Sequence, residues 1–176
     1  MEQLIQEWGY LILALYSFGG GMVALVAAGI LSYSGDLNIV IAIVVATTAN
    51  FVGDQFLFTL ARNNKNQAKS IMQKYRRKIA LSHILMRKYG SIVIFIQKYI
   101  YGVKTLIPLA MGITKYDYKK FILFNILASI LWGLVVGLAS YYLGNIIYDY
   151  IKEFKEIAIG LIIFLVLLVG YWLRKT

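Results

Sequence analysis

Three charged side chains lie inside segments of this chain that are otherwise uncharged. Asp54 is the only charged residue in 37–61, and Lys98 and Lys104 are the only ones in 89–114. A charged side chain at the centre of a bilayer costs roughly 2.5–3.5 kcal/mol, so such residues usually face protein or water and mark a functional site. A hydrophobic protein that keeps one acid and two bases in such segments is predicted to hold or move something charged.

The composition sets the class of protein. The chain has 176 residues, of which 60% are hydrophobic and 15% charged, with a mean hydropathy of +0.71. A soluble domain of this length could not remove so much apolar surface from water. The sequence therefore predicts one integral membrane domain over residues 1–176.

The scarcity of reactive and metal-binding side chains argues against an enzyme. The chain has no cysteine and a single histidine, His83, and its few acids are scattered. A lipid phosphatase would need an activated nucleophile or a metal cluster. We expect no catalytic residue, no metal site and no cofactor.

A strongly basic stretch separates the two segments that contain the charged residues. Between residues 62 and 88 there are nine lysines and arginines and no acid. Next to membrane segments, such a stretch indicates a cytoplasmic linker facing anionic lipid, and it argues against nucleic acid as the partner. Apolar residues at helical spacing within 62–88 predict a basic amphipathic helix on the inner leaflet.

Five apolar segments are long enough to cross a bilayer, which takes about 20 residues in a helix. They are 8–31, 37–61, 89–114, 121–148 and 157–173. The charge pattern disagrees with five crossings, because basic residues flank 89–114 on both sides and would hold both of its ends in the cytoplasm. We therefore expect 89–114 to enter the membrane and return as a re-entrant hairpin. Gly102 is its predicted tip, and Pro108 would interrupt its helical hydrogen bonds.

The first segment, 8–31, is interrupted by Gly19–Gly21 and is expected to be a second re-entrant hairpin on the opposite face. Hairpin 8–31 with span 37–61 is then repeated, inverted, as hairpin 89–114 with span 121–148. The predicted fold class is an all-α integral membrane protein built from this inverted repeat, with a C-terminal transmembrane helix at 157–173 and amphipathic interfacial helices. Broken segments at corresponding positions of two inverted halves indicate the central site of a transporter.

A set of spaced residues resembles the DedA family of bacterial membrane proteins over roughly residues 15–145. The resemblance is carried by Gly53-Asp54, Phe58, Arg62, the run Phe95–Thr105, Pro108, Gly112, Phe121, Asn125 and Trp132. Gly53, Gly102, Pro108 and Gly112 are expected to be structural, allowing backbones to approach closely and the hairpin to break. The chain departs from the family pattern in having Lys98 and Lys104 where the family has arginines. It also lacks the acidic residues that the family has in the first hairpin. It therefore has no carboxylates at those positions through which proton coupling could run.

The resemblance implies a function in moving phospholipids or polyprenyl-phosphate carrier lipids across the bacterial inner membrane, as a flippase or scramblase with a central basic cavity. Lys98 and Lys104 would bind the phosphate head group, or alternatively reach water from the interface as snorkelling side chains. Asp54 would be their counter-charge or a proton acceptor, or a structural salt-bridge partner. Arg62 lies at the expected edge of the membrane, and it is expected either to bind substrate or to anchor its segment there.

Two other functions remain open on the sequence. One is a proton- or ion-coupled antiporter that supports membrane potential and envelope homeostasis, and the other is a non-transporting membrane assembly factor. The expected partners are membrane lipids, either anionic phospholipid or polyprenyl phosphate, and self-association into a homo-oligomer is left open. The expected location is the bacterial inner membrane, crossed several times.

Overall fold

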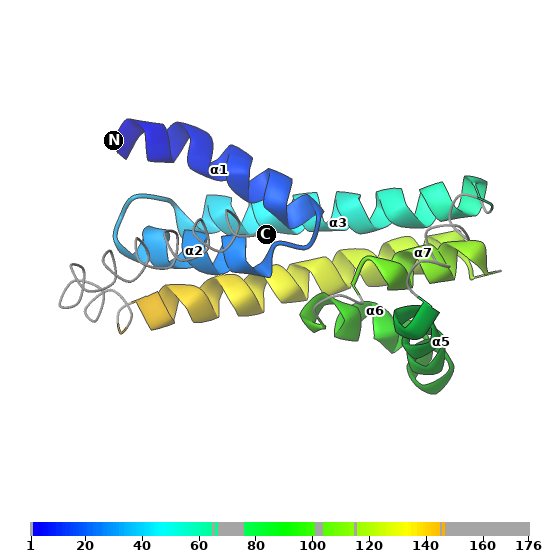
Figure 1. The fold of residues 1–176 in the computed structure, drawn as a ribbon. Coiled ribbons are helices and arrows are strands. Elements are labelled where there is room, and N and C mark those ends of the chain that lie inside the picture. Colours follow the sequence, from blue (N-terminus) through cyan, green and yellow to red (C-terminus); the bar gives the residue numbers. More distant parts are fainter. Residues whose placement is uncertain are drawn as a thin grey trace, which may run out of the picture.

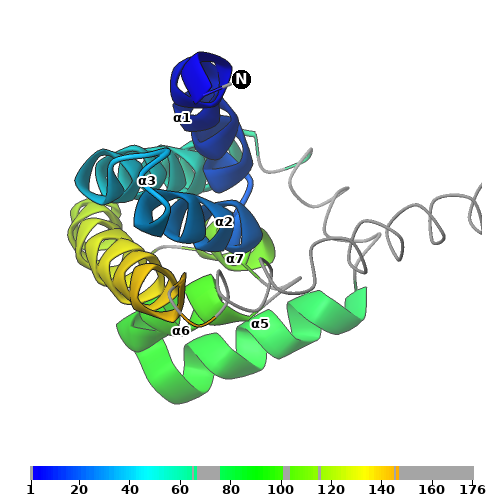
Figure 2. The ribbon, with the colours of Figure 1, turned by 90° about the vertical axis from the view of Figure 1, so that its left-hand side faces the viewer.

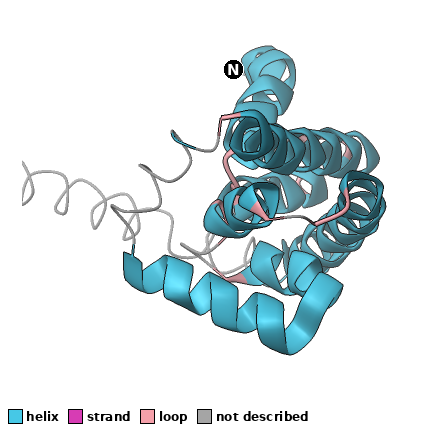
Figure 3. Cartoon of the chain, turned by 90° about the vertical axis from the view of Figure 1, so that its right-hand side faces the viewer, coloured by secondary structure: helices cyan, strands magenta, loops and turns pink. Residues whose placement is uncertain are grey.

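The structure is a computed structural model that describes residues 2–64, 66, 76–100, 104–114, 116–144 and 146. Regular structure in these residues is entirely helical (Figure 3), which confirms the all-α prediction for this part of the chain. The helices are α1 (Glu2–Phe18), α2 (Met22–Tyr33), α3 (Ile39–Asn63), α5 (Arg76–Tyr89), α6 (Val93–Ile96), α7 (Leu106–Ile113) and a long helix, Tyr118–Gly144, with short 3-10 turns at Gly90–Ile92 and Gln97–Tyr99. The predicted tip Gly102, much of the 62–88 linker, and the segments 145–156 and 157–173 lie outside the described residues, apart from residue 146.

Two of these helices, α3 and Tyr118–Gly144, are long and apolar enough to cross a membrane by length and composition. They pack side by side and run in opposite directions (Figure 1). Small residues bring them close, because a Cβ atom added at Gly133 would meet Thr47 and one added at Gly137 would meet Ile43. Further along the pair, the Phe58 and Phe121 rings stack with centroids 4.0 Å apart.

The first broken segment forms two helices joined by a glycine turn. α1 ends at Phe18, and Gly20 has φ +106°, a conformation that glycine adopts without a steric penalty. The chain turns back, so α2 runs opposite to α1 (Figure 1). The backbone N–H of Asn38, at the start of α3, donates to the Tyr10 hydroxyl at 2.7 Å. The beginning of the segment 8–31 and the residues after α2 therefore lie at the same end of α3.

The two ends of the second broken segment lie at the other end of α3, where Arg62 donates to the Tyr116 carbonyl. The hydroxyls of Ser91 and Tyr116 share a hydrogen bond of 2.6 Å, which brings together the residues at its beginning and those just after it. Pro108 lies in the first turn of α7, where its missing N–H has no intrahelical partner to lose, so it starts this helix without breaking it. α5 lies across the bundle on the side away from α1 (Figure 2).

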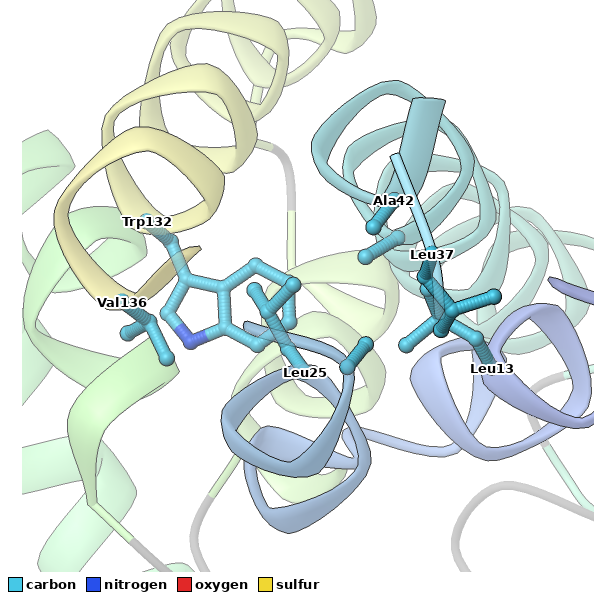
Figure 4. Close-up of a cluster of buried hydrophobic side chains, with 8 residues drawn as sticks. Leu13, Leu25, Leu37, Ala42, Trp132 and Val136 are labelled. Carbon is cyan, nitrogen blue, oxygen red and sulfur yellow. The ribbon is translucent and has the colours of Figure 1, made fainter. Parts of the chain in front are cut away.

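Three apolar clusters fill the space between the helices, the smallest joining Ala61 of α3 to Leu106 and Leu109 of α7. In another, Leu25 of α2 lies against the indole ring of Trp132 on the long helix (Figure 4). In the third, Phe58 and Phe121 pack with Ile107 of α7. The opposite sides of the same helices expose large apolar side chains, which a soluble protein would cover. These side chains include Val40, Val44, Phe56, Leu127, Leu131, Leu134 and Leu138.

Gly53 marks the closest approach of the first hairpin to α3. A Cβ atom there would overlap the Phe18 carbonyl group. We expect Gly53→Ala to lower the thermal midpoint of the detergent-purified protein. Overpacking typically costs about 1–3 kcal/mol, whereas alanine within a helix should otherwise gain roughly 0.5–1 kcal/mol.

Gly19→Ala is the matched control, because an added Cβ there would make only an ordinary contact 3.8 Å from the Tyr16 carbonyl oxygen. A Gly53→Ala protein at least as stable as the Gly19→Ala protein would contradict the packing described.

Candidate functional site

A buried ion pair joins α3 to the second broken segment. Lys98 lies in the 3-10 turn Gln97–Tyr99, and its ammonium nitrogen is 2.9 Å from an Asp54 carboxylate oxygen on α3. The Lys98 and Asp54 side chains are 0% and 2% exposed. The structure thus brings together two of the four predicted site residues, from opposite halves of the proposed repeat.

The same ammonium group reaches three more oxygen atoms. Lys98 donates to Asn50 Oδ1 at 2.6 Å, Ser129 Oγ at 2.9 Å and Asn125 Oδ1 at 3.1 Å. Asn50 and Asp54 are four residues apart on α3, and Asn125 and Ser129 are four apart on the long helix, so each helix presents two polar groups on one face. The Lys98 ammonium is therefore enclosed between both long helices.

The surrounding hydrogen bonds hold this arrangement in place. The Gln97 side-chain amide donates to the same Asp54 oxygen at 3.3 Å. The Asn125 amide donates to the Phe51 backbone carbonyl at 3.1 Å, tying the long helix directly to α3. An ion pair away from water repays its desolvation only when further hydrogen bonds satisfy both groups, and those bonds are present around Lys98.

Lys104 is buried in a different environment. It is 7% exposed, and among the described residues its ammonium nitrogen has no hydrogen-bond partner. The nitrogen lies 5.2 Å from the centroid of the Trp132 ring, a cation–π arrangement. The side chain also lies against the turn of the first hairpin, where a Cβ atom added at Gly20 would be 2.9 Å from the Lys104 Cδ. Lys104 thus reaches from the second broken segment to the first.

Arg62 lies apart from these lysines, at the end of α3. Its Nε donates to the Gly112 carbonyl at 3.0 Å, and its Nη2 donates to the Tyr116 carbonyl. The guanidinium carbon lies 4.8 Å from the centroid of the Phe58 ring. Gly112 itself packs directly on the Phe58 carbonyl. Arg62 therefore links the end of α7 to α3 by hydrogen bonds. The structure does not place Arg62 beside Asp54, Lys98 or Lys104.

Sequence reasoning missed several members of this cluster. Asn50 and Ser129 were not singled out, and Asn125 entered only through the family resemblance. Trp132 entered through the same resemblance and was expected to be a packing or membrane-interface residue. The available signal was the pairing of polar residues four apart inside apolar helices, at 50 with 54 and at 125 with 129. The structure brings the two pairs to one level, since Lys98 contacts all four residues and Ser129 Oγ donates to Asn50 Oδ1 at 3.4 Å.

The comparisons with known proteins agree on one family of membrane proteins. Residues 10–142 match the VTT domain family. The chain is 23% identical over 180 residues to the inner membrane protein YohD of Escherichia coli K12, covering 99% of this chain and 94% of YohD. It is 27% identical over 168 residues to the protein DedA of the same organism, covering 83% of this chain and 75% of DedA. An uncharacterized membrane protein of Mycobacterium leprae, ML0287, is 26% identical over 128 residues, covering 69% of this chain and 56% of that protein. No solved structure matches.

The buried pair makes a prediction about stability. Lys98→Met or Asp54→Asn alone leaves an uncompensated buried group, which typically costs about 3–5 kcal/mol. We expect each single variant to lower the free energy of unfolding in detergent by an amount of this order. The double variant should cost less than the sum of the two, because it removes both charges together.

Lys119→Met provides the control, since Lys119 is exposed and should change stability little. If the changes in the free energy of unfolding caused by Lys98→Met and Asp54→Asn were strictly additive in the double variant, the two charges would not stabilise each other.

Proposed function

This chain belongs to the VTT domain family of membrane proteins, the DedA family, and on that premise we propose that it is a transporter that moves a phosphate-bearing lipid across the bacterial inner membrane. The lipid is a phospholipid or a polyprenyl-phosphate carrier, flipped or scrambled between leaflets without covalent change. The protein acts as a transporter, with no enzymatic step and no cofactor.

We propose that the two broken segments are re-entrant hairpins of an inverted repeat. Support comes from the two hydrogen bonds that bring each segment's ends together, Tyr10 with Asn38 and Ser91 with Tyr116, at opposite ends of α3. The antiparallel packing of the two long helices also supports it. In such a design, each hairpin enters the membrane from one face and returns to it, and the hairpin turns meet near the middle.

The observation that carries the proposed function is the group of buried charges where the two halves meet. A phosphate head group can leave water only if positive charge and hydrogen-bond donors replace its hydration. Lys104 supplies that positive charge without a hydrogen-bond partner among the described residues, and Lys98, paired with Asp54, joins the two halves beside it. Rocking of one half against the other would expose this centre to each leaflet in turn.

An ion-coupled antiporter fits these contacts less well. It needs a carboxylate that is free to bind and release its ion, whereas Asp54 accepts hydrogen bonds from both Lys98 and Gln97. A non-transporting assembly factor would give no reason to keep two lysines buried in an apolar interior.

Transport can be tested with purified protein in liposomes that contain a panel of fluorescent phospholipids or polyprenyl phosphate. We expect Lys104→Ala and Lys98→Ala each to lower the translocation rate by at least about tenfold. Lys104→Ala removes the positive charge, and Lys98→Ala removes the ion pair that holds the helices around it. Lys104→Arg should retain transport, since it preserves the charge.

Lys119→Ala is the matched control for loss of a lysine at an exposed position. Full transport by the Lys98→Ala/Lys104→Ala double variant, inserted at normal levels, would refute the role of this centre.

The proposed topology is tested by labelling. The natural chain has no cysteine, so single cysteines at Arg87, Lys119 and Asp36 can be labelled with a membrane-impermeant thiol reagent in intact cells and in inverted vesicles. Positions 87 and 119 should react from one side and position 36 from the other. Labelling of 87 and 119 from opposite sides would refute the inverted repeat.

A further inference from the structure

We infer that the two buried lysines divide the work: Lys104, together with the indole N–H of Trp132, binds the phosphate group, whereas Lys98 holds the helices in position and does not touch it. This inference rests on the proposed function and specifies the binding residues of that same centre. It assigns a role to Trp132, and it separates the two lysines.

Lys98 has no donor left to offer. Its ammonium group carries three N–H bonds, and four oxygen atoms of Asn50, Asp54, Asn125 and Ser129 already lie 2.6–3.1 Å from the nitrogen. An incoming phosphate would have to displace one of these oxygens and leave it buried without a partner. Lys98 therefore serves as the fixed centre of a structural tie between α3 and the long helix.

Lys104 shows the opposite situation. All three of its N–H bonds lack an oxygen partner among the described residues, although the side chain is buried. A buried donor without a partner lowers the stability of the folded protein, and a charged donor lowers it more than a neutral one. The contact with the Trp132 ring is favourable, but a ring face does not supply an oxygen acceptor for any of the three N–H bonds.

The neighbouring tryptophan adds a second donor of the same kind. Trp132 is fully buried, and its indole nitrogen likewise has no hydrogen-bond partner among the described residues. An indole N–H can only donate, so it is satisfied only by an acceptor. Together, Lys104 and Trp132 offer a positive charge and several donors that find no acceptor in the part of the chain that the structure describes.

This excess of donors defines the class of ligand. A phosphate group presents several acceptor oxygens around a compact negative charge, so it can accept from the ammonium and the indole together. The turn of the first hairpin lies directly against the Lys104 amine, since a Cβ atom at Gly20 would be 3.1 Å from its nitrogen. The phosphate therefore binds where the second broken segment meets this glycine turn. A lipid phosphate and free phosphate share this chemistry.

The chain provides its own reporter for this site. Trp8 is 55% exposed and Trp172 lies outside the described residues, so Trp8→Phe/Trp172→Phe leaves Trp132 as the only tryptophan. The full-length reporter protein in detergent is titrated with dioctanoyl phosphatidic acid, inorganic phosphate and dioctanoylglycerol. We expect a saturable change in Trp132 emission and a rise in thermal midpoint with phosphatidic acid, and none with dioctanoylglycerol. An equal response to inorganic phosphate at the same concentration would assign the site to free phosphate.

Variants of the reporter separate the two lysines. Lys104→Met should weaken binding of phosphatidic acid by at least about tenfold, because it removes the charge. Lys98→Met/Asp54→Asn should bind within about threefold of the reporter, since it removes the buried pair together and leaves Lys104 in place. In the natural background, Trp132→Phe keeps an aromatic ring but loses the indole N–H, and should reduce the thermal shift with phosphatidic acid.

The opposite pattern would overturn the inference: binding kept by Lys104→Met and lost by Lys98→Met/Asp54→Asn, or no response to either phosphate probe. Liposome transport separates this failure from failure of the proposed function. Transport that persists without any Trp132 response refutes only the assignment of Lys104 and Trp132. A normal Trp132 response in a protein that moves no lipid refutes transport and leaves the binding site standing.

Discussion

The need to satisfy one buried ammonium group organises the centre of this protein. Lys98 lies in a short 3-10 turn between apolar segments, far from water, and its charge is stable there only with an anion and further oxygen atoms around it. Those oxygens come from two antiparallel helices, at Asn50 and Asp54 on one and at Asn125 and Ser129 on the other. The ammonium therefore fixes the register of both helices and the position of the second broken segment together.

Close backbone contacts make this arrangement sterically feasible. Gly53 adjoins Asp54 on α3 and lets the Phe18 carbonyl of the first hairpin approach, and Gly112 lets α7 approach the Phe58 carbonyl. Without hydration to drive helices together in lipid, packing of small residues and hydrogen bonds between helices are the main sources of association. Arg62 adds two hydrogen bonds to the backbone at the end of α7 and fastens the edge of the same interface.

The charges at the centre are unequal in a way that suits binding. Lys98 and Asp54 form an ion pair with each other. The Lys104 ammonium and the Trp132 indole N–H have no hydrogen-bond acceptor among the described residues. A cost of this kind is retained at functional sites, where a ligand supplies the missing partner. The turn of the first hairpin beside Lys104 is Gly19–Gly21, so it places no carboxylate there.

The sequence alone determined the class of protein, its helical segments and the exceptional residues. Uninterrupted apolar runs predicted α3 and the long helix, Gly19–Gly21 predicted the break after α1, and charge in an apolar setting singled out Asp54, Lys98 and Lys104. These signals are local, because they depend on composition and helical spacing. Which lysine meets Asp54, and which is left beside Trp132, depends on the register between two antiparallel helices and on where Lys104 meets the glycine turn after α1. That pairing joins residues more than 40 positions apart, and only packing in three dimensions could decide it.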